Sequence, residues 1–207
     1  MEKSDLTKLY KSYYTASETP KIIVFEKTQY LAILGKGDPD SKSFSTTIEA
    51  LYATAYALKF IYKALKNDFI VPKLEGQWWY DKEKYKNLSF AEITEQVKRS
   101  EWEYRLMIRM PDFVSSEMIE QVIANTAAKK LLPEIKDIHH YFLEEGKCVQ
   151  ALHVGPFAKE PETINRINDF MVSNNLTQNG LHHEIYLSDF RKTSPEKLKT
   201  ILREPVI

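Results

Sequence analysis

The chain has 207 residues, enough to bury a substantial core, and 29 Lys and Arg residues balance 29 Asp and Glu residues. The zero net charge gives no support to direct nucleic-acid binding or to attachment at an anionic membrane surface. Cys148 is the only cysteine, residues 1–5 carry no apolar signal core, and no stretch approaches the roughly 20 apolar residues that span a bilayer, so we expect a soluble, cytoplasmic protein.

The first half of the chain alternates between strand-like and helix-like patterns. In chain order, its expected elements are an N-terminal arm with helical spacing (1–20), two strands around a turn (22–25 and 30–34), a glycine loop (35–39), a helix (43 or 45 to about 67), an aromatic segment (74–80) and a strand (102–110). Strict alternation places Trp102, Tyr104, Leu106 and Ile108 on one side of that last strand, which Pro111 ends.

The second half repeats this order with shorter connections. Its expected elements are a helix (115 or 116 to about 132), a hairpin (138–143 and 148–154) ended by Gly155 and Pro156, a helix (160–174), a strand (182–187) and a last helix (195 to about 202). The order strand, strand, glycine loop, helix, strand thus occurs twice, at about 22–110 and 138–189. We therefore expect a pseudo-symmetric α+β body in which a cleft between the two halves is the natural binding place.

The strand at 182–187 places a carboxylate in an informative position. Alternate side chains of a strand share a face, so His182, Glu184 and Tyr186 lie together, while the opposite face with Ile185 is packed. The face of Glu184 is then either exposed to solvent or the lining of a cavity. Beside aromatic walls, a carboxylate can pair with a cationic ligand or act as a base toward water. A solvated strand position is the alternative interpretation.

Aromatic residues are unusually frequent, with 12 Tyr, 10 Phe and 3 Trp. Trp78 and Trp79 are adjacent and point to opposite sides of an extended segment, so one can form a wall of a ligand site, and the interpretation favours Trp79. Trp102 and Tyr104 approach the strand of Glu184 if the pseudo-symmetry holds. Ordinary core packing is the alternative for both.

Other motifs give little support to further chemistry. His153 shares a strand face with small apolar residues, where a satisfied core histidine is the usual interpretation. The two pairs of adjacent histidines, at 139–140 and 182–183, lack metal-ligand spacing, so we expect no metal site. Neither a phosphate-binding loop nor a serine nucleophile elbow is present, and we expect no cofactor.

Three segments resemble the GyrI-like small-molecule-binding domain family. Residues 151–157 (ALHVGPF) are similar to the family's strand and glycine–aromatic turn, and residues 183–189 (HEIYLSD) to its glutamate-bearing strand. Residues 74–79 (LEGQWW) resemble a stand-alone subgroup that has no DNA-binding domain. The resemblance covers about residues 20–190. Phe157 stands where family members commonly have Tyr, so any role that needs a hydroxyl group there is lost.

The resemblance implies a tandem of strand–helix–strand–strand modules, an antiparallel sheet with helices on one side, around a central aromatic pocket with Glu184 at its base. We expect an arm (1–20) and a single domain (21–207) of two repeats, about 21–111 and 112–207. The predicted catalytic residues are Glu184, Tyr104 and Tyr186, and the predicted ligand-binding residues are Trp79, Trp78, Trp102, His153, Phe157 and Tyr56.

The resemblance also implies a function. Some stand-alone members are implied to hydrolyse genotoxic natural products that carry a cyclopropane ring, with Glu184 here activating water and a tyrosine assisting. The expected partner is a hydrophobic or cationic aromatic small molecule. The alternatives are a non-catalytic binder that sequesters cationic aromatic drugs and a protein-interaction module that inhibits gyrase, which the zero net charge does not favour.

Overall fold

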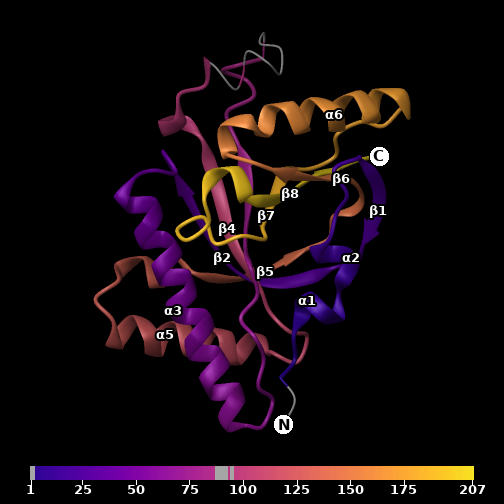
Figure 1. The fold of residues 1–207 in the computed structure, drawn as a ribbon. Helices are drawn as coiled ribbons and strands as arrows, with labels where there is room; N and C mark the ends of the chain where they lie inside the picture. The colour runs from indigo at the N-terminus through magenta and orange to yellow at the C-terminus, as the bar shows by residue number, and fades with distance from the viewer. Residues whose placement is uncertain (1–2, 87–92, 94–95) are drawn as a thin grey trace.

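The computed structural model describes residues 3–86, 93 and 96–207. Its centre is one curled antiparallel sheet of eight strands in the order β1-β6-β8-β7-β3-β4-β2-β5. The strands are β1 (Lys21–Phe25), β2 (Thr28–Lys36), β3 (Leu74–Trp79), β4 (Glu103–Arg109), β5 (His139–Leu143), β6 (Gly146–Val154), β7 (His182–Tyr186) and β8 (Lys199–Pro205). The helices are α1 (Leu6–Leu9), α2 (Lys11–Tyr14), α3 (Lys42–Ala64), α5 (Ser116–Lys129) and α6 (Glu160–Ser173) (Figure 1).

The sheet contains two copies of one module, as expected. In the first, β2, α3, β3 and β4 follow one another, and β4 pairs with both other strands. In the second, β6, α6, β7 and β8 repeat this pattern around β8. Antiparallel pairing of β3 with β7 joins the modules, with Gly76 opposite Glu184 and Trp78 opposite His182. The α+β class and the strand–helix–strand–strand duplication are therefore confirmed.

The outermost strands are exchanged between the modules. β1 precedes β2 in the chain but pairs with β6, and β5 precedes β6 but pairs with β2. The hairpin predicted at 138–154 is therefore wrong, and the turn after β1 does not make β1 and β2 partners. Contacts across the molecule decide the pairing, since Phe25 of β1 packs with Cys148 of β6 and with Tyr13 of the arm.

The last predicted helix is also a strand. Residues 195–197 form a short 3-10 helix, and the chain then extends as β8 between β6 and β7. Every residue of β8 after Lys199 is buried. Its two buried charged residues have polar partners: Arg203 donates to Gln150 and Glu145, and Glu204 bonds to Gln178 and His182.

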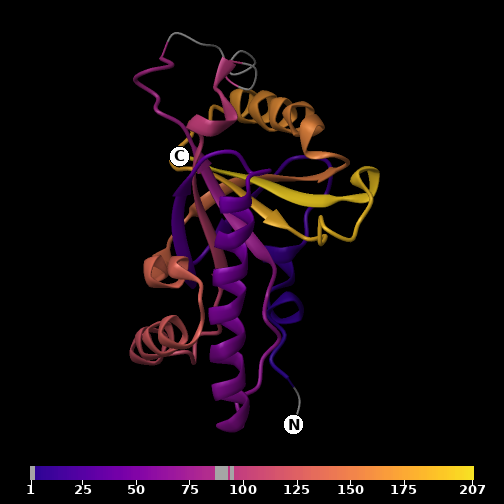
Figure 2. The ribbon, with the colours of Figure 1, turned by 90° about the vertical axis from the view of Figure 1, so that its left-hand side faces the viewer.

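Helices cover one face of the sheet and the N-terminal arm covers the other. α3 packs on β2 and β4, with α5 beside it, and α6 packs on β6 and β8 (Figures 1 and 2). We call this the helix face. On the opposite face, which we call the arm face, α1 and α2 pack over Phe25, Ile185 and Ile201. Alternation in β7 therefore assigns Glu184 to the helix face and His183 to the arm face.

The arm face holds a buried polar network. The Glu145 carboxylate accepts from Arg203 at 2.7 Å and lies 2.8 Å from the Nδ1 atom of His183. The Nε2 atom of His183 lies 3.1 Å from Glu75, which also accepts from the Tyr13 hydroxyl group. Tyr13 thus anchors the arm to β3 through a carboxylate that is fully buried.

Candidate functional site

The candidate site is centred on Glu184, at the junction of the two modules on the helix face. Its side chain is 12 % exposed, and its Oε1 atom lies 3.2 Å from the Nε2 atom of His182. The Nδ1 atom of His182 pairs with Glu204 of β8. Burial disfavours the imidazolium, but these two carboxylates outweigh it and raise the pKa of His182 well above its ordinary value. A protonated His182 therefore holds Glu184 from one side.

An indole–phenol pair lies next to Glu184. The Nε1 atom of Trp78 donates a hydrogen bond to the Tyr186 hydroxyl group at 2.9 Å. Burial and the nearby charge of Glu184 raise the pKa of Tyr186 well above its ordinary value, so this phenol stays protonated. Gly76 makes room for the pair, since a Cβ atom there would lie 3.0 Å from both bonded atoms.

Aromatic rings from both modules surround this pair. The Trp78 ring lies 5.4 Å from Tyr104 and 5.8 Å, stacked, from Phe44 of α3. From the second module, Phe157 and Phe190 approach Tyr186 edge-on at 6.1 and 6.5 Å. Tyr104 is buried, whereas Phe157 is 39 % exposed. The cluster is therefore buried on the α3 side and open to solvent on the side of Phe157.

Four of the nine predicted site residues lie outside this cluster. Trp79 lies on the arm face, where its Nε1 atom donates to Glu103 at 2.9 Å, so Trp78 and not Trp79 shares a face with Glu184. Trp102 packs edge-on against Tyr80. His153 lies 3.0 Å from the Thr163 hydroxyl group and 3.1 Å from a backbone carbonyl oxygen, as a satisfied core histidine does. Tyr56 is 46 % exposed on α3.

The structure adds Glu160, Phe44 and Phe190 to the site. The first two lie in the first turns of α6 and α3, which are equivalent positions in the two modules. The duplication visible in the sequence could have indicated them, because both helices begin next to the junction. Phe190 follows β7 in an irregular segment, and no pattern singled it out.

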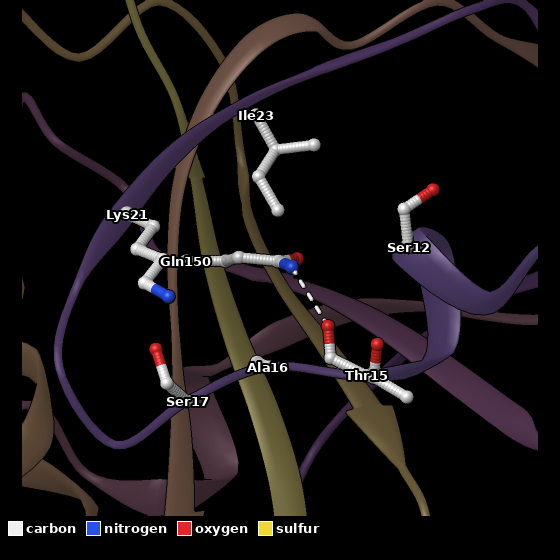
Figure 3. A pocket seen from close by; sticks show the side chains of 7 residues that line it. All are labelled: Ser12, Thr15, Ala16, Ser17, Lys21, Ile23 and Gln150. Carbon is white, nitrogen blue, oxygen red and sulfur yellow. Dashed lines mark hydrogen bonds between the residues drawn. The ribbon is translucent and has the colours of Figure 1, made fainter.

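A surface pocket of about 360 Å³ lies elsewhere, between the arm and β1 (Figure 3). Its lining includes Ser12, Ser17 and Lys21, and the Gln150 side-chain amide group donates to the Thr15 carbonyl oxygen at 3.2 Å. Gln150 belongs to the arm face, so the sheet separates this pocket from Glu184. Among residues 3–86, 93 and 96–207, no group of three or more His, Cys, Asp and Glu residues could hold a metal ion.

A duplicated α+β domain with an acidic, aromatic-lined junction describes a class of small-molecule-binding modules. The chain belongs to the family of GyrI-like small-molecule-binding domains, whose model matches residues 18–206. This confirms the resemblance seen in the sequence.

Solved structures agree with this assignment. An uncharacterized conserved protein from Listeria innocua is 36% identical over 99% of this chain and 100% of its own, with a TM-score of 0.87. A protein described as a hydrolase from Listeria innocua is also 36% identical, with the same coverage and a TM-score of 0.84. The C-terminal domain of EcmrR shares the fold at 12% identity, over 91% of this chain and 96% of its own, with a TM-score of 0.56. No protein with a curated description matches the chain.

Within the described ranges, none of the helices combines the length and the apolar character that crossing a bilayer requires.

Proposed function

We propose that the chain hydrolyses flat, hydrophobic molecules that carry a strained cyclopropane ring, adding water to the ring and so detoxifying a genotoxin. The observation that carries the proposal is the Glu184 carboxylate, held by His182 beside aromatic rings from both modules. The Listeria innocua relative described as a hydrolase supports a hydrolytic reaction at the same fold.

Glu184 acts as the general base in this proposal. The Glu184 side chain is 12 % exposed, so a water molecule can lie against it. His182 fixes the orientation of the carboxylate, since Glu204 holds the other imidazole nitrogen. A positioned base of this kind contributes roughly 10²–10⁴-fold to a rate.

The aromatic rings supply binding in this proposal. In this proposal a planar ligand stacks against Phe157, which is 39 % exposed, and against the half-buried Trp78, and its strained ring lies next to Glu184. Tyr186 assists through its hydroxyl group, whereas Tyr104, whose hydroxyl group lies over Gly35 of β2, packs against the Trp78 ring. Strain in the substrate lowers the barrier, and the reaction needs only water as co-reactant.

A second candidate function is the sequestering of cationic aromatic drugs without chemistry. The carboxyl groups of Glu160, Glu184 and Glu204 are close to a single imidazolium, which favours a ligand that carries positive charge. In this function the same carboxylate pairs with the cation and no bond is broken.

Incubation with a cyclopropane-bearing DNA alkylating agent tests the proposal by mass spectrometry of the small molecule. Hydrolysis adds the mass of one water molecule, and the Glu184→Gln variant should lose at least about 100-fold in kcat/KM. The Glu196→Gln variant, altered at an exposed position in the same module, should keep full activity. An unchanged small molecule with quenched tryptophan fluorescence would instead support the binder, and full activity of Glu184→Gln would refute the base.

A further inference from the structure

Glu160 is a second carboxyl group at the site. The proposed general-base role of Glu184 leaves Glu160 without a function. It is the first residue of α6 and is 8% exposed. Its Oε1 atom is buried and has no hydrogen-bond partner among the residues that the structure describes. An unpartnered buried oxygen is costly, so its retention beside the Glu184 carboxylate calls for an explanation.

The two carboxyl groups have different surroundings. Glu184 lies at hydrogen-bonding distance from His182, whereas no Lys, Arg or His nitrogen within the described ranges forms an ion pair with Glu160. Burial and the charge of Glu184 raise the pKa of Glu160 well above its ordinary value, and His182 and the Thr200 hydroxyl group only partly oppose this. Glu160 therefore favours its neutral form.

The groups that act on Glu160 come from two neighbouring strands of the helix face, β7 and β8. They are His182, Glu184 and Tyr186 of β7 and Thr200 of β8. Among these groups, His182 pairs with two carboxylates: its Nδ1 atom with Glu204 and its Nε2 atom with Glu184. Tyr186 is held by Trp78 and is a much weaker acid. Glu160 is therefore the buried carboxyl group at this site that is protonated and can donate a proton.

We propose that Glu160 is the general acid of the reaction, complementary to Glu184, and this rests on the proposed hydrolysis. Two carboxyl groups in different surroundings can divide acid and base roles. Water loses a proton to Glu184 while its oxygen bonds to a ring carbon, and the strained carbon–carbon bond breaks. The electron pair of that bond passes to an electron-accepting group on the ring, such as a carbonyl oxygen, which takes the proton of Glu160. A proton then returns from Glu184 to Glu160 through solvent, so the net reaction adds one water molecule.

This assignment narrows the substrate class. A simple cyclopropane has nowhere to place the electron pair, so an acid beside the base is useful only where the ring is conjugated to an acceptor. The substrate is therefore an activated cyclopropane, with the acceptor oxygen on the side of α6 and the attacked carbon on the side of β7.

The Glu160→Gln variant tests this role, because glutamine keeps the size of the side chain but cannot transfer a proton. We expect kcat for an acceptor-conjugated cyclopropane to fall about 100-fold, with the dissociation constant measured by tryptophan fluorescence changed less than about twofold. The alkaline limb of the pH–rate profile should also disappear. Glu162→Gln is the matched control, since Glu162 is exposed in the same first helical turn.

The infrared band of a buried protonated carboxylic acid gives a readout that does not depend on turnover. It should be present in the wild type and in Glu162→Gln and absent from Glu160→Gln. Full turnover by Glu160→Gln together with loss of turnover by Glu184→Gln would refute the acid and leave the hydrolase intact. Absence of the band from the wild type would refute the acid on its own, and absence of wild-type turnover would refute both proposals.

Discussion

The buried network of the arm face gives the sharpest stability prediction. Replacing Glu145 with Gln removes the carboxylate that accepts from Arg203 at 2.7 Å and lies 2.8 Å from His183. Both partners are 0% exposed, so solvent cannot replace the lost charge. Burial alone would raise the pKa of Glu145, but His183 and Arg203 lower it from 4.5 to about 2. A shift of this size corresponds to about 3 kcal/mol of folding free energy.

The sign of the pH dependence follows from the direction of each shift. The lowered pKa of Glu145 gives stability that is present above pH 4.5 and is lost as the pH falls toward 2. Burial opposes the charge of His183, but Glu145 and Glu75 raise its pKa above 6.5, so its contribution is complete below that pH and is lost at higher pH. The network should therefore stabilise the fold most between about pH 4.5 and 6.5.

Urea unfolding followed by tryptophan fluorescence measures this effect. At pH 5.5, Glu145→Gln should lower the free energy of unfolding by about 3 kcal/mol, and its stability should depend less on pH between 5 and 3 than that of the wild type. Glu144→Gln, at the exposed neighbouring position, should stay within about 0.5 kcal/mol of the wild type. A Glu145→Gln variant as stable as Glu144→Gln would refute the reasoning.

Two glycine substitutions test how the aromatic cluster is held. Gly35→Ala places a Cβ atom 2.3 Å from the Tyr104 ring, so the ring must move and the fold should lose about 1–3 kcal/mol, measured as a lower Tm; an unchanged Tm would contradict the packing described. Gly76→Ala places a Cβ atom 3.0 Å from both the Trp78 Nε1 atom and the Tyr186 hydroxyl group. The hydrogen bond between these two side chains should therefore lengthen, and the tryptophan emission should shift. An emission spectrum identical to that of the wild type would contradict this arrangement.

Much of the fold could be predicted because each module repeats a local pattern. Alternation located the strands at 102–110 and 182–187, and Ser115 does cap α5. Pairing could not be predicted in the same way. The connection between β1 and β2 is two residues long and suits a hairpin, yet both outer strands pair with the other module. Sequence patterns specify which face of a strand is apolar but not which neighbour covers its edge.

Strand alternation predicted which site residues share a face of the sheet. It could not predict which residues, far apart in sequence, lie beside them. Glu184 and Tyr186 share a face with Trp78 because β3 and β7 are paired in register. The choice between Trp78 and Trp79 required that register, which the sequence does not contain. His182 could be placed beside Glu184 by alternation. Its second carboxylate, Glu204, lies in β8, and the sequence predicted the first part of that strand as the end of a helix.

The two faces of β7 explain how one short strand can support both the stability of the fold and the proposed function. His183 points to the arm face, where it is 0% exposed and bound by two carboxylates, and Tyr13 closes that side. Glu184, the next residue, points to the helix face, where 12 % of its side chain is still exposed. A rigid, fully paired face fixes the backbone of β3 and β7, and this lets the opposite face keep an incompletely paired carboxyl group, Glu160, without losing its geometry. If that division holds, Glu145→Gln should reduce turnover only to the extent that it reduces the folded fraction, whereas Glu184→Gln should abolish turnover in a fully folded protein.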